Sequence, residues 1–359
     1  MTAYYDVTPR SFNLPKVELH THLDGDVRSE TILHFAKKRG IKLPADTVEE
    51  VRDLVTFVKT PNVPLDFSKF DFVNAAVGGC REALKRIAYE FVETKFKEGV
   101  IYVEARYSPH LFANSKVTPV VSGQIPGDVT PEDALVAVLE GFKEGEEKFG
   151  IKVRSILCCI LAFPYWCDEV VELCKKYRDR GVVGIDIAGG RPPQEFFFCK
   201  EEVKAFQDAF EHGIHRTVHA GEVDSAKHVE FAVDVLKAER IGHGTKIIED
   251  MEIYKKVVGK DVHIEVCPFS NYISDSWDYS TPHPVVKFKE DGVNYSINSD
   301  DSSMFRKGLN GNYSFLAERY GFTIDEFKRT NINAAKAAFL PEDEKKELLD
   351  KLYKAYGIQ

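Results

Sequence analysis

The sequence predicts an α/β protein folded as a (β/α)8 barrel, the TIM-barrel architecture, with extra helices after the first strand and at the C-terminus. Short runs rich in β-branched residues alternate with longer amphipathic segments, as in parallel sheets with helical crossovers. Eight such runs occur, which is the number that closes this barrel. The chain of 359 residues fits one barrel with insertions and contains no repeat or linker. We therefore expect a single barrel domain over residues 1–359.

The predicted strands are short apolar runs that end at polar or glycine residues. They cover residues 17–20, 101–106, 153–157, 182–187, 216–219, 240–242, 263–266 and 293–298. The amphipathic segments between the later strands predict helices at residues 131–149, 167–180, 201–212, 225–238 and 250–258. Two more helical segments, residues 323–338 and 341–356, follow the last strand, and we expect them to pack on the outside of the barrel.

The connection between the first two strands is far longer than one helical crossover. It contains three helical patterns, at residues 29–39, 47–59 and 79–97. The segment 61–70 lies between the last two and carries Phe67 and Phe70. Excess length after a barrel strand lies at the catalytic face, so we interpret this segment as a lid whose two phenylalanines cover the pocket. An outer helical layer is the alternative interpretation.

Composition and charge exclude several classes of protein. The net charge of −9 argues against a general nucleic-acid or anionic-membrane surface, because such a surface needs a basic face. No apolar run is long enough to form a transmembrane segment, and residues 1–10 lack the apolar core of a signal peptide. The seven cysteines have no Cys-x-x-Cys spacing, which indicates free thiols in a reducing compartment. We therefore expect a cytoplasmic protein.

Two histidines, His20 and His22, stand two residues apart at the end of the first predicted strand. Strand side chains alternate between faces, so these imidazoles point the same way and can bind one metal ion. Two hydrogen-bonded surface histidines are the alternative. Other polar groups directly follow the later strands: His219, Glu222, His243, Asp300 and Asp301.

Strand ends from distant parts of a barrel sequence converge on one face. The convergence predicts a metal site of three imidazoles and one carboxylate: His20, His22, His219 and Asp300. This ligand set suits Zn²⁺, which lowers the pKa of bound water from about 15.7 toward roughly 7. With Glu222 and His243 nearby, the predicted reaction class is metal-assisted hydrolysis. Alternatively, His219 is a core histidine and Asp300 caps a helix over residues 302–305.

These motifs resemble those of the adenosine deaminase family, and most of all its intracellular animal members. The similarity runs from about Pro15 to Gly357. The motifs are Lys-Val-Glu-Leu-His-Thr-His-Leu-Asp-Gly, Val-Glu-Ala-Arg-Tyr-Ser-Pro-His, Arg-Ser-Ile-Leu-Cys-Cys, His-Arg-Thr-Val-His-Ala-Gly-Glu, Ile-Gly-His-Gly, Ser-Asp-Asp and Asn-Ile-Asn-Ala-Ala-Lys. The resemblance implies a zinc-containing (β/α)8 barrel with one Zn²⁺ per chain. It also implies hydrolytic deamination of a purine nucleoside, adenosine or 2′-deoxyadenosine, to inosine or 2′-deoxyinosine plus ammonia. In that reaction zinc-activated hydroxide attacks purine C6, a step of purine salvage and catabolism.

The resemblance also assigns roles to single residues. The family's zinc ligands match His20, His22, His219 and Asp300, and His22 is expected to contact the substrate as well. Glu222 matches a protonated carboxyl beside purine N1, and Asp301 matches the group that contacts N7. His243 matches the residue that orients and helps to deprotonate the water, or acts electrostatically as a charged group. The backbone N–H of Gly189 is implied to contact N3, and Asp24 to accept a hydrogen bond from the ribose 5′-hydroxyl.

Asp24 bears on substrate choice within the wider family. Adenine deaminases usually carry Glu at this position and relatives acting on N6-methylated AMP carry Asn, whereas an aspartate repels a 5′-phosphate. The chain departs from the family pattern at Asp26, at residues 190–193 and in the order of residues 61–70. We expect these departures near the pocket mouth, where they affect substrate breadth.

Several other functions fit the sequence less well than adenosine deamination. Another amidohydrolase would act on adenine, a methylthio-nucleoside or a non-purine amide, but free adenine has no 5′-hydroxyl for Asp24 to bind. A purine-binding or cell-surface interaction protein without activity is disfavoured because every catalytic position is intact. The sequence leaves open whether a protein partner binds the outer helices. The nucleic-acid deaminases are excluded, because the chain lacks their Pro-Cys-x-x-Cys zinc motif.

Overall fold

Eight parallel strands form one sheet in sequence order in the computed structural model, which describes residues 12–60, 65–189 and 198–358. The strands are β1 (Lys16–His22), β2 (Val100–Tyr107), β3 (Lys152–Ile160), β4 (Val182–Ala188), β5 (His215–Ala220), β6 (Arg240–His243), β7 (His263–Val266) and β8 (Tyr295–Ile297). Each strand pairs in parallel with the next. A bridge between Thr21 and Asp300 brings β1 to the segment after β8, so the barrel is nearly closed. The predicted fold class is confirmed.

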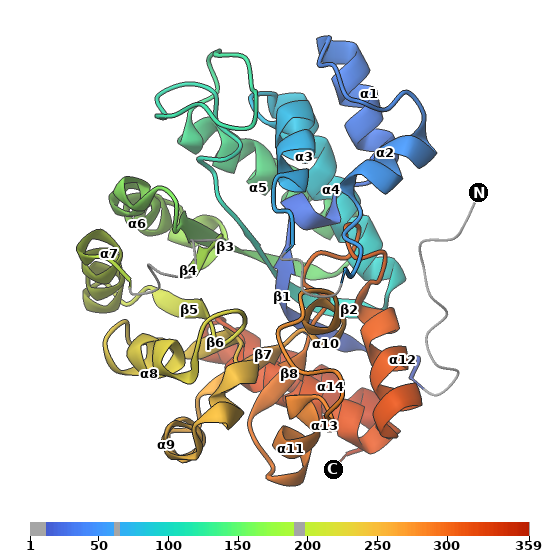
Figure 1. Ribbon diagram of the computed structural model, residues 1–359, viewed down its shortest axis with the longest axis vertical. Coiled ribbons are helices and arrows are strands. Elements are labelled where there is room, and N and C mark those ends of the chain that lie inside the picture. Colours follow the sequence, from blue (N-terminus) through green and yellow to red (C-terminus); the bar gives the residue numbers. More distant parts are fainter. Residues whose placement is uncertain (1–11, 61–64, 190–197, 359) are drawn as a thin grey trace.

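Helices surround this barrel in the ribbon view (Figure 1). The first group, between β1 and β2, comprises α1 (Ser29–Arg39), α2 (Val48–Val55), α3 (Lys69–Val77) and α4 (Arg81–Lys97). The crossover helices between later strands are α5 (Pro131–Phe149), α6 (Cys167–Tyr177), α7 (Lys200–Glu211), α8 (Ala226–Asp234), α9 (Met251–Gly259), α10 (Pro268–Ile273) and α11 (Pro284–Glu290). The last group follows β8: α12 (Leu309–Tyr320), α13 (Ile324–Ala337) and α14 (Glu342–Tyr356). The extra helices after the first strand and at the C-terminus are therefore present, as predicted.

Helix boundaries follow local capping chemistry. In α5, the Thr130 hydroxyl accepts from the backbone N–H of Asp133, whose carboxylate accepts from the N–H of Thr130, and Pro131 occupies the first turn. The helix ends at Gly150, whose φ of +72° suits glycine. Where such signals were weak the prediction erred: α2 ends at Val55 and α8 at Asp234, both earlier than expected.

The barrel interior contains charges as well as apolar side chains. Glu104 and Arg106 lie two residues apart on β2, so they share a face, and both are completely buried. Other buried charges come from β4, β6 and β7: Asp186, Arg240 and Glu265. Buried charges are rare unless they are paired, so this interior is built for more than packing. Among the described residues, no helix is long and apolar enough to cross a membrane.

The helices between β1 and β2 stand at one end of the molecule and reach over the barrel mouth (Figure 1). Phe57, which follows α2, packs on Phe305, with ring centroids 5.5 Å apart, and on Phe70 at 5.9 Å. Phe67 also contacts Phe57, at 6.2 Å, but it is half exposed. This aromatic cluster joins the segment after β1 to the segment after β8. Residues 61–64 of the predicted lid lie outside the described residues.

Candidate active site

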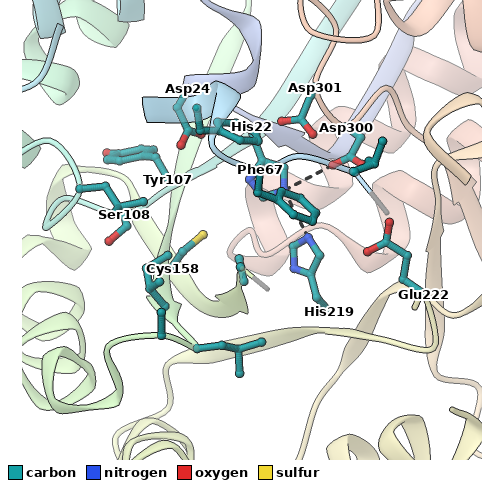
Figure 2. Close-up of a pocket in the computed structure, with 18 of the residues that line it drawn as sticks. His22, Asp24, Phe67, Tyr107, Ser108, Cys158, His219, Glu222, Asp300 and Asp301 are labelled. Carbon is teal, nitrogen blue, oxygen red and sulfur yellow. Dashed lines mark hydrogen bonds and ion pairs between the residues drawn. The ribbon is translucent and has the colours of Figure 1, made fainter. Parts of the chain in front are cut away.

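Four side chains converge at the carboxyl ends of the strands, with their ligand atoms within 4.8 Å of one another: His20, His22, His219 and Asp300. The Nε2 atoms of His22 and His219 are 3.2 Å apart. Asp300 Oδ1 lies 3.3 Å from His20 Nε2 and 3.4 Å from His22 Nε2. Figure 2 shows His22 between Asp300 and His219, with dashed lines to both. The structure thus brings together all four residues that the sequence singled out as ligands.

The backbone fixes Asp300 against β1. Its N–H donates to the carbonyl of His20 at 3.1 Å, and its carbonyl accepts from the N–H of His22 at 2.9 Å. Asp300 has a φ of +65°, and so does His243 at the end of β6. Residues other than glycine rarely adopt this region, and such strain gathers at functional sites. The strand-to-loop transition therefore aims both side chains into the same space.

The donor set fits a metal ion because two imidazoles are oriented by carboxylates. His20 Nδ1 pairs with Glu265 Oε2 at 2.8 Å, and His219 Nδ1 pairs with Asp186 Oδ2 at 2.8 Å. Each pair fixes the proton on Nδ1 and leaves the Nε2 lone pair facing the cluster, as in metal-bound histidines. Arg106 donates to both carboxylates, at 2.8 and 2.7 Å, and balances their charge. Three such nitrogens and a carboxylate suit zinc.

Two further groups face this cluster, Glu222 and His243. Their side chains approach to 3.6 Å between Oε2 and Nε2, and His243 Nε2 lies 3.9 Å from Asp300 Oδ2. Burial raises the pKa of Glu222 to about 8, and the charge of Asp300 adds to this shift. Burial also lowers the pKa of His243 well below its ordinary value. At neutral pH this wall therefore presents a protonated carboxyl and an uncharged imidazole.

Asp24 and Asp301 line the same cavity as Glu222 and lie above it in the view of Figure 2. Asp24 belongs to the short 3-10 turn η1 (Asp24–Asp26) directly after β1. Within the described part of the chain, Asp24 Oδ1 and Asp301 Oδ1 have no hydrogen-bond partner, although both atoms are buried. Burial raises the pKa of Asp24 to about 6, and burial together with the charge of Asp300 raises that of Asp301 well above its usual range. Gly25 makes room for Asp301, because a Cβ there would lie 1.8 Å from its Oδ1.

One cavity of about 530 Å³, a volume suited to a small molecule, is lined by the side chains of His22, Asp24, His219, Glu222, His243, Asp300 and Asp301. Its other walls are mostly apolar and include Phe67 and Phe70, and Gly189 closes the end of β4 with a φ of +91°. Tyr107, Ser108 and Cys158 stand on the side opposite Glu222 (Figure 2). A flat aromatic ligand with one polar edge toward Glu222 would fit between these walls.

One expectation about the site is wrong. Asp26 does not lie at the pocket mouth; it is buried beneath η1, where its Oδ2 lies 3.3 Å from Lys95 Nζ. The 3-10 turn η1, to which Asp26 belongs, places this carboxylate on the side away from the cavity. The departures at residues 190–193 lie outside the described residues. Residues 302–305 form turns instead of a helix, so Asp300 is not a helix cap.

Sequence reasoning missed the groups that orient the predicted ligands: Arg106, Asp186 and Glu265. Each is a charged residue inside a predicted strand, and such a residue within a buried apolar run is itself a signal. It also missed Asn271 of α10, whose Nδ2 lies 3.1 Å from His243 Nδ1. Cys267 forms a second candidate ligand group with His20, His243 and Asp300.

Known proteins resemble this chain over nearly its whole length. A family model described as adenosine deaminase matches residues 15–355. The adenosine deaminase of Bos taurus is 55% identical over 348 residues, covering 97% of this chain and 96% of the relative. That of Mus musculus is 55% identical over 346 residues, covering 96% and 98%.

Solved structures agree with the fold. A zinc-bound amidohydrolase from Burkholderia ambifaria matches with a TM-score of 0.80 at 25% identity, covering 96% of this chain and 92% of that one. An adenine deaminase from Arthrobacter aurescens matches with a TM-score of 0.79 at 25% identity, covering 96% and 99%. The family model and the animal relatives cover the barrel, the four converging ligands and the pocket wall together. On these grounds the chain belongs to the adenosine deaminase family.

Proposed function

We propose that this chain hydrolyses adenosine and 2′-deoxyadenosine to inosine and 2′-deoxyinosine, releasing ammonia. The observation that carries the proposal is the convergence of His20, His22, His219 and Asp300 on a cavity that also contains a protonated Glu222. The reaction balances with one water. Its oxygen replaces N6 at C6, one of its protons leaves with the amino group as ammonia, and the other ends on N1.

The cofactor in this proposal is one zinc ion per chain, bound by those four residues. The carboxylate-oriented imidazoles support it, as does the zinc in the structure of the Burkholderia ambifaria amidohydrolase. When bound, zinc supplies a Lewis acid that lowers the pKa of water toward neutrality. The four ligands leave the cavity side of the cluster open to water and substrate.

Glu222 is proposed as the proton donor to N1. Attack at C6 moves electron density onto N1, and a neutral carboxyl can neutralise it by giving up its proton. Burial keeps that proton on Glu222 up to a pH of about 8. His243 faces the same space, 3.9 Å from Asp300, and is proposed to act on the attacking water. Its lowered pKa disfavours the charged role at neutral pH, and its position suits contact with the attacking water.

The opposite wall is proposed to hold the nucleoside. A protonated Asp301 donates to N7, which has only a lone pair, and the N–H of Gly189 donates to N3. Asp24 accepts from the ribose 5′-hydroxyl, and its unpartnered Oδ1 supports this role, while His22 contacts the substrate as well. An anionic Asp24 repels a 5′-phosphate, which favours nucleosides over nucleotides. Phe67 and Phe70 are proposed as the lid that excludes water.

The chain is proposed to act as one domain in the cytoplasm. All seven cysteines are free, which supports a reducing compartment. The net charge of −9 and the lack of a Pro-Cys-x-x-Cys motif in the sequence argue against a role on nucleic acid.

The test is a substrate comparison with purified protein. Adenosine, 2′-deoxyadenosine, adenine, AMP and 5′-methylthioadenosine are incubated separately, and loss of the 6-aminopurine absorbance is followed. We expect rapid loss only with the first two. Turnover of adenine or AMP in preference to adenosine would refute the proposal. Glu222→Gln is the matched control, because it keeps the pocket's shape and removes the proton donor.

A further inference from the structure

His243 is held from behind by a chain of three hydrogen bonds that leads away from the metal cluster. Its Nδ1 lies 3.1 Å from Asn271 Nδ2. Asn271 Oδ1 lies 3.2 Å from His283 Nε2, and the backbone N–H of Val285 donates to His283 Nδ1 at 3.0 Å. Asn271 and His283 are completely buried, and His243 is 1% exposed. Water is therefore excluded from these three hydrogen bonds.

The direction of the chain is set at its far end. A backbone N–H can only donate, so His283 Nδ1 must accept from Val285. The burial of His283 lowers its pKa to about 3, so the ring is neutral and carries its single proton on Nε2. That proton is donated to Asn271 Oδ1. The reverse orientation of Asn271 would require His283 to accept at both nitrogens and carry no proton.

The orientation of Asn271 then fixes His243. With its oxygen toward His283, Asn271 presents its amide N–H to His243 Nδ1, which accepts. A neutral His243 must therefore carry its proton on Nε2, the atom that faces Glu222 and Asp300. The Trp277 ring packs edge-on against His283, with centroids 4.5 Å apart, and holds that ring in place.

We propose that Asn271 and His283 are positioning residues that fix His243 as its Nε2–H tautomer, so that His243 donates a hydrogen bond to the attacking oxygen. This inference rests on the proposed function and makes His243 a neutral hydrogen-bond donor instead of a base or a charged group. A neutral ring with its proton on Nε2 has no lone pair to accept a proton from water. It instead stabilises negative charge that develops on the attacking oxygen, as a preorganised donor does. Proton removal from the water then falls to the metal site.

The primary test reads the tautomer directly. Zinc-loaded protein with ¹⁵N-labelled histidine is examined by NMR, in which a nitrogen with a lone pair resonates well downfield of one with a proton. The His243 signals are assigned by their loss in His243→Gln. We expect the proton on Nε2 and the lone pair on Nδ1. A proton on Nδ1 with a free Nε2, or protons on both nitrogens, would overturn the inference.

One variant reverses the direction of the hydrogen bonds that Asn271 makes. Asn271→Asp places a carboxylate, which only accepts, against both histidines, so His243 must carry its proton on Nδ1. We expect the two His243 nitrogen signals to exchange character. Removing one preorganised donor should lower kcat by roughly 10²-fold or more, with little change in KM, because the donor acts on the transition state.

The matched control is Asn294→Asp. Asn294 also contacts a buried histidine, with its Oδ1 2.7 Å from His263 Nδ1, at the other end of the barrel. That contact already uses an acceptor oxygen, so the tautomer of His263 and the value of kcat should stay unchanged. If Asn271→Asp does not fold, Asn271→Ser replaces it, since a hydroxyl donates or accepts and should give His243 a mixture of tautomers.

The outcomes separate this inference from the proposed function. Failure of the parent protein to deaminate adenosine would refute the function, whatever the tautomer. Normal deamination with an unchanged kcat in a folded Asn271→Asp would refute only the role of Asn271.

Discussion

Gly25→Ala tests whether the turn after β1 sets the position of Asp301. An added Cβ would lie 1.8 Å from Asp301 Oδ1 and 2.5 Å from its Cγ. Ordinary contact begins at 3.4 Å, so the carboxyl must move by about 1.6 Å. A misplacement of about 1 Å in a site can cost roughly 10²-fold in rate, which corresponds to about 2.7 kcal/mol. We therefore expect kcat/KM for adenosine to fall at least 10²-fold.

The same clash should affect stability less than activity. Overpacking typically costs about 1–3 kcal/mol, a shift that thermal unfolding detects. Gly259→Ala is the control, because a Cβ there meets nothing within 4 Å and alanine favours the end of α9. Gly25→Ala and Asp301→Ala together form a double-mutant cycle. If the clash acts through Asp301, the fold-loss of kcat/KM in the double variant is smaller than the product of the two single fold-losses. A Gly25→Ala enzyme within threefold of Gly259→Ala would refute the assigned geometry.

Two other variants and two changes of condition test the remaining roles. Glu222→Gln should keep its metal but lose roughly 10²-fold or more in kcat, and near-normal kcat would reassign the proton donor. The pKa of Glu222 is raised to about 8, so the donating form is lost as pH rises through that value; kcat/KM should fall there in the parent but not in Glu222→Gln. Asp24→Ala should lower the ratio of kcat/KM for adenosine over 5′-deoxyadenosine by roughly 10- to 150-fold, and an unchanged ratio would remove Asp24 from the 5′-hydroxyl. Chelation should abolish activity and lower Tm, with both restored by about one zinc per chain; active protein free of transition metal would contradict the metal site.

The strands were predictable because buried parallel strands have a strong local pattern. All eight predicted runs coincide with strands, and α5 has the predicted bounds, since its capping residues occur in the sequence. The helices α3, α10, α11 and α12 were missed. Two of them, α10 and α11, are only six and seven residues long, too short to show a helical period, although each begins with a proline.

The site residues likewise fall into those that the sequence predicts and those that it does not. His20, His22, His219 and Asp300 follow strand ends, and barrel geometry alone places such residues together. Asn271 and His283 gave no signal, because the contact between them depends on where α10 and α11 pack, not on spacing along the chain. The position of Asp26 was predicted wrongly for a related reason: sequence adjacency to Asp24 did not reveal that η1 turns the two carboxylates to different sides.

The charged interior of the barrel explains why these ligands can be held so closely. Burial alone would raise the pKa of Asp186, but its contact with His219 and the positive charge of Arg106 hold that pKa well below its ordinary range. Glu265 is held charged in the same way, by Arg106 and by Arg240, which donates to its Oε1 at 2.7 Å. Each carboxylate thus contacts a histidine that is a predicted metal ligand and also pairs with an arginine. Removing Arg106 would leave Asp186 without an arginine partner and Glu265 with Arg240 alone, and breaking such a buried pair costs about 3–5 kcal/mol. The orientation of the metal ligands and the stability of the barrel therefore depend on the same ion pairs, and neither can be changed alone.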